Sequence, residues 1–167
     1  IEIWDVLKKD SEKLIEYYTE VIEEFNLNRQ VVYDKIKAKY NENPNGLDLV
    51  IISRTCYGGV IRFTTEGKLS TPIGPHKPIS PATFAARVKQ WKQCVENTDF
   101  FHQSFEETMA LAEYGDIIYC DPPYVDSQAI LYGSQSFSFK KLISEIQRCK
   151  DIGAKVALSI DGKKKSG

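Results

Sequence analysis

The chain has 167 residues, of which 42% are hydrophobic and 27% are charged, and its formal net charge is −1. These values are those of a globular protein that can bury a core in one domain or in two small ones. No apolar stretch approaches the length of a membrane span and the start does not resemble a signal peptide, so we expect no membrane association and a cytoplasmic location.

The cysteines and histidines do not form a metal-binding or disulfide pattern. The four cysteines are irregularly spaced without any C-x-x-C pair, and the chain has only two histidines. We therefore expect no zinc site and no disulfide framework, and free thiols in a reducing compartment.

Charge is distributed unevenly along the chain. Residues 54–92 hold seven basic side chains and one acidic side chain, a net charge of +6, whereas residues 1–53 carry −4 and residues 93–167 carry −3. A basic block within an acidic chain is a candidate surface for phosphate groups, and an ordinary solvated face is the alternative.

The first part of the chain is predicted to be helical. Residues 11–25 carry apolar side chains at helical spacing behind a capping residue at Asp10 or Ser11. Residues 29–40 are predicted to form a second, shorter helix. The apolar residues 47–53 fit a helix or a strand equally well.

Residues 57–72 predict a β-hairpin. An aromatic and β-branched arm over 57–63 is followed by a glycine-containing loop at 64–67 and a second arm at 68–72. The hairpin falls within the basic block, which makes it a candidate nucleic-acid contact.

The second half of the chain alternates helices and strands. Helices are predicted at 82–96, 105–113 and 139–151, and strands at 116–120 and 155–160. A strand, a helix and a second strand within about 45 residues form a βαβ unit, so the two strands are expected to be parallel.

The most informative feature is the exit of the strand at 116–120, which runs directly into Asp121, Pro122, Pro123 and Tyr124. The prolines end the strand and supply no N–H donor, while their carbonyls remain acceptors. A carboxylate, a fixed carbonyl and a flat ring suit a planar ligand with an exocyclic amino group, which two acceptors would hold and aim at an electrophile. A purely structural Pro-Pro turn capped by an aspartate is the alternative.

This quartet resembles the catalytic motif of amino-group DNA methyltransferases. The resemblance implies that Asp121 and a prolyl carbonyl bind the amino group of a flipped adenine, that Tyr124 stacks on the base, and that S-adenosylmethionine supplies the methyl group, with Asp121 also contacting this cofactor. Amino methyltransferases that act on RNA or protein carry similar quartets, and a non-catalytic DNA-binding module is a further alternative.

A second match covers the hairpin, where Arg54, Tyr57-Gly58-Gly59, Arg62, Gly67, Pro72 and Gly74 resemble the DNA-recognition hairpin of Dam-like adenine methyltransferases. This resemblance implies that Tyr57 inserts into the base stack of double-stranded DNA and that Arg62 reads a guanine edge. Further DNA contacts are expected at Val60, Pro72, His76, Arg54 and Lys77. Packing of Tyr57 on the second helix and a surface salt bridge at Arg62 are the alternatives.

The resemblance also sets the expected architecture. It implies an α/β fold, with residues 81–167 as part of a Rossmann-like methyltransferase sheet and catalytic domain, and residues 1–80 as a helical and β-hairpin target-recognition region. Tyr132 and Phe137 are candidates for the base pocket, although Phe137 could instead only staple the following helix. We expect the 167 residues to be an internal fragment of a restriction-modification enzyme that has a cognate endonuclease as its functional partner.

Overall fold

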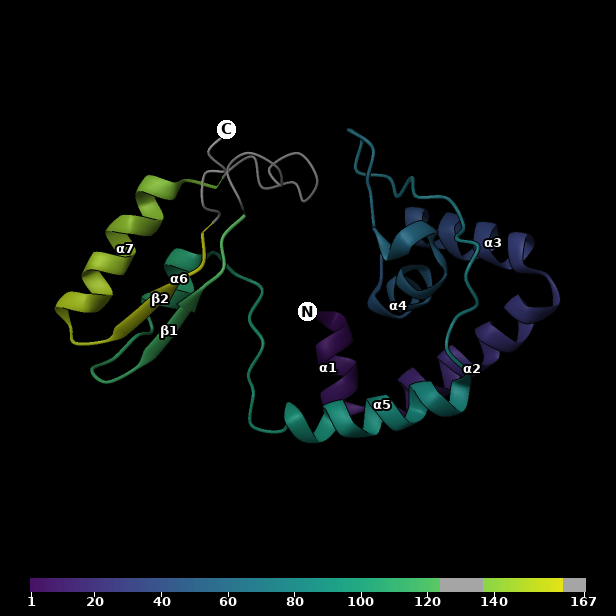
Figure 1. The fold of residues 1–167 in the computed structure, drawn as a ribbon, viewed down its shortest axis with the longest axis horizontal. Helices are drawn as coiled ribbons and strands as arrows, with labels where there is room; N and C mark the ends of the chain where they lie inside the picture. Colours follow the sequence, from purple (N-terminus) through teal and green to yellow (C-terminus); the bar gives the residue numbers. More distant parts are fainter. Residues whose placement is uncertain (124–136, 161–167) are drawn as a thin grey trace, which may run out of the picture. The chain divides into compact units, whose positions relative to one another are not determined.

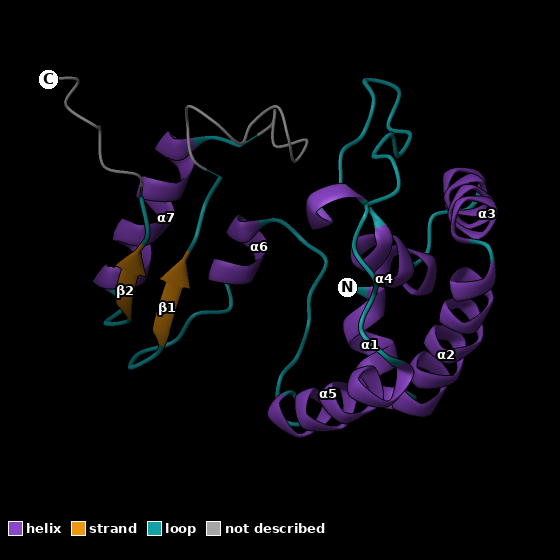
Figure 2. Cartoon of the chain, turned by 45° about the vertical axis from the view of Figure 1, so that its right-hand side comes forward, coloured by secondary structure: helices purple, strands orange, loops and turns teal. Residues whose placement is uncertain are grey.

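The structure is a computed structural model that describes residues 1–123 and 137–160. The chain forms two compact units, residues 1–100 and residues 101–167 (Figure 1). The first unit consists of helices and one long loop, and the second contains a small sheet with helices (Figure 2).

The first unit contains α1 (Glu2–Lys9), α2 (Ser11–Leu27), α3 (Arg29–Glu42), α4 (Gly46–Thr55), the 3₁₀ turn η1 (Tyr57–Gly59) and α5 (Pro81–Cys94). The helices predicted at 11–25, 29–40 and 82–96 are confirmed. The stretch 47–53, which fits either structure by sequence, is helical, and α1 is not among the predicted elements.

Side-chain caps define where helices α2 and α5 begin. The Asp10 carboxylate accepts a hydrogen bond from the Lys13 amide at 3.2 Å at the start of α2. The Ser80 hydroxyl caps α5 by accepting from the Thr83 amide at 3.2 Å, with Pro81 in the first turn where its missing N–H costs nothing. Both caps lie at boundaries that the sequence predicts.

Helix α2 lies at the centre of the core of the first unit. Its side chains Tyr18, Ile22 and Phe25 are fully buried. The Tyr18 ring stacks on Phe84 of α5 with the centroids 3.7 Å apart, and the Tyr18 hydroxyl donates to the Ile79 carbonyl at 2.9 Å. Helix α5 therefore belongs to the helical unit, and the compact units divide after Phe100. The division into recognition and catalytic regions after residue 80 stays a prediction.

The hairpin predicted at 57–72 is not confirmed. Its two arms meet in isolated antiparallel bridges, Cys56 with Ile73 and Phe63 with Leu69, without a continuous ladder. The first arm instead begins with η1, in which Gly58 takes the left-handed φ of 64°. That backbone conformation curls the chain away from a straight strand.

The second unit contains α6 (Phe105–Met109), β1 (Ile117–Cys120), α7 (Phe139–Asp151) and β2 (Lys155–Leu158). The two strands are parallel, in a register that pairs Ile117 with Lys155 and Cys120 with Leu158, as the βαβ pattern predicts. This mixture of helices with a small parallel sheet agrees with the α/β class. The larger Rossmann-like sheet stays a prediction.

Helix α6 ends at Met109, four residues before its predicted end. The Met109 carbonyl accepts from the Arg148 guanidinium of α7 at 2.6 Å, and the Glu113 amide donates to the Asp116 carboxylate at 2.8 Å. The groups that would extend the helix are thus bound elsewhere.

Among the described residues, no helix is both long and apolar enough to cross a membrane.

We predict that the buried Asp48 carboxylate is a major source of stability for the first unit. It accepts hydrogen bonds from the Tyr17 hydroxyl, from Lys39 Nζ at 3.1 Å and from Asn45 Nδ2 at 2.6 Å, and its side chain is completely buried. Asp48→Ala leaves these donors without their acceptor and is expected to cost about 3 kcal/mol of unfolding free energy. Urea unfolding followed by tryptophan fluorescence measures this, because Trp4 and Trp91 both lie in the first unit.

The matched control is Asp34→Ala, which removes an exposed carboxylate that accepts from Gln30 within α3 at 2.9 Å. Substitutions of this kind at the surface change the free energy of unfolding by no more than about 0.5 kcal/mol. Equal unfolding midpoints for the two variants would show that the Asp48 network contributes nothing.

Candidate active site and nucleic-acid interface

The exit of β1 lies at the carboxyl edge of the parallel sheet. The Cys120 carbonyl accepts from the Ser159 amide at 2.9 Å, and the chain then passes through Asp121, Pro122 and Pro123. Since neither proline has an N–H, the pairing with the neighbouring strand stops there. Ligands of open α/β sheets bind at this edge, which is where the sequence places its candidate catalytic residues.

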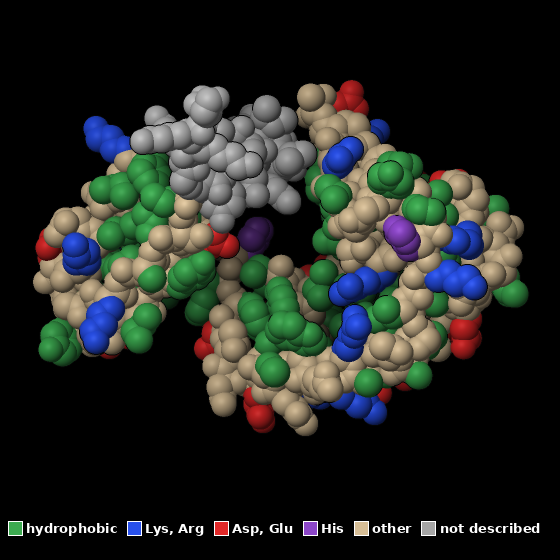
Figure 3. All heavy atoms as spheres, in the orientation of Figure 1, with side chains coloured by type: hydrophobic (Ala, Val, Ile, Leu, Met, Phe, Trp, Pro, Cys, Tyr) green, Lys and Arg blue, Asp and Glu red, His purple; other side chains and the backbone are tan. Residues whose placement is uncertain are grey.

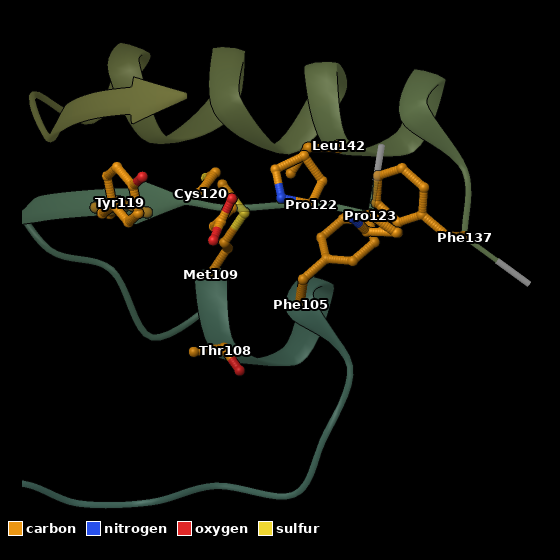
Figure 4. Close-up of a pocket in the computed structure, with 11 residues that line it drawn as sticks. Phe105, Thr108, Met109, Tyr119, Cys120, Pro122, Pro123, Phe137 and Leu142 are labelled. Atoms are coloured by element: carbon orange, nitrogen blue, oxygen red, sulfur yellow. The ribbon is translucent and has the colours of Figure 1, made fainter. Parts of the chain in front are cut away.

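A pocket of about 340 Å³ opens beside this exit. Its walls come from α6, from β1 and its exit, and from the chain before and within α7 (Figure 4). The lining residues are Phe105, Thr108, Met109, Ile118, Tyr119, Cys120, Asp121, Pro122, Pro123, Phe137 and Leu142. Most of these side chains are apolar, so the pocket suits a flat or hydrophobic group.

Two aromatic rings form one end of the pocket. Phe105 and Phe137 lie with their centroids 5.8 Å apart and their planes 58° apart. Phe137 directly precedes Ser138, which caps α7, and packs against the apolar cluster that contains Leu142. Phe137 therefore lines the pocket and also packs against the start of α7, so both interpretations made from the sequence fit its position. Its role in binding a base stays a prediction.

The polar groups at the exit of β1 are the Asp121 carboxylate and the prolyl carbonyls, all of them acceptors, while Thr108 and Tyr119 bring hydroxyl groups to the rest of the pocket. Asp121 is exposed, and within the described residues no hydrogen bond or ion pair engages its carboxylate. The neighbouring Cys120 is buried, and this burial raises the pKa of its thiol. An open carboxylate next to prolyl carbonyls and an apolar wall can bind a planar ring that carries an amino group. Tyr124 and Tyr132, also predicted to act here, lie outside the described residues.

Helix α6, which carries Phe105 and Met109 in the pocket wall, is fixed at both of its ends. At its C-terminal end, Arg148 of α7 donates to the Met109 carbonyl at 2.6 Å. Ser104 and Glu107 form a capping box in which Glu107 Oε2 accepts from the Ser104 amide at 2.8 Å. This hydrogen bond lowers the pKa of Glu107. The sequence predicts the helix but not its role as a wall, because nothing in the local pattern shows which distant element it meets.

The residues predicted to contact DNA lie on the surface of the first unit, in or beside loop 57–76. Tyr57 is 62% exposed and Val60 is 42% exposed. The exposure of Tyr57 does not favour the alternative in which its ring packs on the second helix. Arg62 is also exposed and forms no salt bridge with any described residue. Arg54, Pro72, His76 and Lys77 are exposed as well. Figure 3 shows Lys and Arg side chains gathered on the visible face of this unit.

One residue that holds this loop is absent from the sequence-based candidates. Arg29 of α3 donates to the carbonyls of Gly74, Pro75 and His76 at 2.8, 3.3 and 2.7 Å. Its guanidinium also lies over the Phe25 ring, 5.3 Å from the centroid. Gly74 is required at this point because a Cβ there would lie 2.6 Å from the Cys56 carbonyl oxygen. Arg29 thus sets the path of the chain that carries His76 and Lys77.

One known protein family matches almost the whole chain. The model of one family, D12 class N6 adenine-specific DNA methyltransferase, matches residues 1–165. This match includes both the loop at 57–76 and the exit of β1.

Individual relatives are distant and longer. The retron Ec67 DNA adenine methylase of Escherichia coli is 29% identical over 58% of this chain and 35% of its own length. The DNA adenine methylase of Salmonella typhi is 24% identical over 83% of the chain and 51% of its own length. Type II methyltransferase M.MjaIII of Methanocaldococcus jannaschii is 26% identical over 72% and 45%. The chain thus spans about half the length of these relatives or less, and on the family match over nearly all its residues it belongs to the D12 class N6 adenine-specific DNA methyltransferase family.

Proposed function

We propose that the protein is a site-specific DNA methyltransferase that transfers a methyl group from S-adenosylmethionine to the N6 amino group of adenine in duplex DNA. The observation that carries the proposal is the open Asp121 carboxylate beside Pro122 and Pro123, at the rim of an apolar pocket. The family match over residues 1–165 and relatives named DNA adenine methylases support it.

The chemistry follows from the two acceptors. The Asp121 carboxylate accepts one N–H of the adenine amino group, and the Pro122 carbonyl accepts the other. Together they orient the nitrogen lone pair and favour the positive charge that develops on nitrogen as the new N–C bond forms. The bond between sulfur and the methyl carbon would break at the same time, and its electron pair would stay on sulfur as a neutral thioether. The proton released from nitrogen passes to Asp121, the acceptor already bonded to it. The target base must leave the stack first, because its amino group is otherwise out of reach.

The pocket residues fit part of the cofactor. S-adenosylmethionine, when bound, supplies an electrophilic methyl group on sulfur. Asp121 would contact its methionine end, where a carboxylate favours positive charge, and the apolar wall that includes Met109 and Phe105 suits its less polar parts. Tyr124 would stack on the base, as the family resemblance implies.

DNA binding is assigned to the first unit. Tyr57 would fill or wedge the opened stack, and Arg62 would read a guanine edge in the major groove with its two-pronged guanidinium. Val60, Pro72 and His76 would contact the flanks of the site, and Arg54 and Lys77 would contact phosphates. The exposure of these side chains supports the assignment.

The family match does not favour the alternatives, a non-catalytic DNA-binding module or an amino methyltransferase for RNA or protein. The name of one relative, Type II methyltransferase M.MjaIII, supports a restriction-modification role. In that role a cognate endonuclease that cuts the unmethylated site would be the functional partner, and the enzyme would act in the cytoplasm.

The first prediction for this function concerns Asp121. In the full-length protein, Asp121→Asn keeps the size of the side chain but removes the charge, and is expected to lower methyl transfer by at least about 100-fold. Duplex binding should change little, since the proposed contacts with the duplex around the target base lie in the first unit. Radiolabel transfer measures activity and fluorescence anisotropy measures binding.

Asp151→Asn serves as the control, because it removes a carboxylate at the end of α7 in the same unit. It should retain normal turnover. If the Asp121 variant turned over at the wild-type rate, Asp121 would have no part in the reaction.

The second prediction concerns Arg62. Arg62→Ala is expected to reduce discrimination at one guanine of the site by about 10-fold, because a bidentate arginine–guanine contact is worth roughly 1–3 kcal/mol. Sequencing that maps N6-methyladenine in DNA from a host without other adenine methylation gives the preference at each flanking base.

Lys68→Ala removes an equal charge from the same loop. It should weaken binding evenly across sequences and leave the preference unchanged. An Arg62→Ala enzyme with the same site preference as the wild type would refute the assignment of Arg62 as the guanine reader.

A further inference from the structure

The return arm of the loop, residues 68–76, is held along one face of α3. Four polar residues of α3, each four positions from the next, contact main-chain groups of this arm: Asn41, Lys37, Tyr33 and Arg29. Residues four apart lie on the same side of a helix. The arm therefore runs antiparallel to α3 and meets one of these side chains at each turn.

The contacts begin near the tip of the loop. Asn41 pairs with both main-chain groups of Leu69, accepting from its amide at 2.7 Å and donating to its carbonyl at 3.2 Å. Lys37 Nζ donates to the carbonyls of Ser70 at 3.0 Å and Thr71 at 3.2 Å. These bonds give a chain segment without a strand ladder a defined path.

Thr71 connects this helix face to the first arm of the loop. Its carbonyl accepts from the buried Tyr33 hydroxyl at 2.8 Å. Its own hydroxyl accepts from the Arg62 amide at 2.8 Å and donates to the Val60 carbonyl at 3.0 Å. Thr71 is only 4% exposed, so water cannot readily replace that hydroxyl.

We propose that Thr71 is a positioning residue for sequence discrimination, and that through it the polar face of α3 sets where Arg62 presents its guanidinium. A two-pronged contact with a base edge depends on position within about 0.5 Å, so the backbone from which the arginine extends must be held. Thr71 itself touches no base in this scheme. The inference rests on the proposed function, because it assigns Arg62 a reading role.

The test compares Thr71→Val with Thr71→Ser in the full-length protein. Valine keeps the shape but removes the hydroxyl, and serine keeps the hydroxyl. Mapping of N6-methyladenine should show that the valine variant loses about 10-fold in discrimination at the guanine read by Arg62, equivalent to about 1.4 kcal/mol. The serine variant should retain most of it. The loss should appear in the KM for DNA more than in kcat.

Two controls separate positioning from other effects. Thr64→Val removes a hydroxyl that accepts the Lys68 amide at 3.2 Å in the same loop but has no bond to α3 or Arg62, and it should discriminate normally. Lys37→Met removes the hydrogen bonds that Lys37 donates to the return arm, and should lower discrimination at the guanine about 2- to 3-fold. The salt dependence of binding should be unchanged in Lys37→Met, whereas loss of a phosphate contact would lower its slope by about one.

Amide hydrogen exchange supplies a readout that needs no DNA and no turnover. Exchange at the Arg62 amide should accelerate about 10-fold in Thr71→Val and stay near normal in Thr71→Ser. If Thr71→Val and Lys37→Met both keep wild-type discrimination and Arg62 protection, the positioning role is refuted while the proposed function stands. If the wild-type protein transfers no methyl group to DNA, the proposed function is refuted. In that case, unaltered protection of the Arg62 amide in Thr71→Val would also refute the role of Thr71 in positioning Arg62.

Discussion

The candidate active site depends on how β1 ends. Two consecutive prolines cannot donate to a neighbouring strand, so the pairing of β1 with β2 stops at Cys120, whose carbonyl accepts from the Ser159 amide. The Asp121 carboxylate, just before the two prolines, lies at the carboxyl edge of the parallel sheet, where ligands of open α/β folds bind. A short local sequence thus places a carboxylate and two prolyl carbonyls, all of them acceptors, at the exit of β1, and the proposed function uses these acceptors to bind an amino group.

The apolar surroundings of this site come from parts of the chain that are distant in sequence. Phe105 and Met109 reach the pocket because Arg148 of α7 binds the end of α6, and Leu142 closes it from the other side. A low-dielectric wall strengthens the hydrogen bonds made at the rim. In the proposed function, residues 121–124 would supply the chemistry, and the packing of α6 on α7 would supply the apolar environment.

Sequence patterns predicted the elements that are determined locally. Helices α2, α5 and α7 have side-chain caps and apolar spacing, and β1 and β2 are short apolar runs whose parallel pairing follows from the helix between them. The ambiguous stretch 47–53 was decided by tertiary packing, since Ile51 and Ile52 are buried in the helical core. The predicted hairpin is not confirmed, because its arms meet only in isolated bridges while the return arm directs Leu69 and Thr71 to Asn41 and Tyr33 of α3. No local sequence pattern predicts these long-range contacts. The pocket wall was missed for the same reason.

The most direct test of the central claim is the identity of the methylated nucleoside. The full-length protein would be incubated with S-adenosylmethionine carrying an isotopically labelled methyl group and with unmethylated plasmid DNA, and the DNA would then be hydrolysed and analysed by mass spectrometry. The proposed function predicts that all of the label appears in N6-methyldeoxyadenosine. Label on a cytosine, or no label in DNA under conditions where the protein is folded and saturated with cofactor, would contradict it.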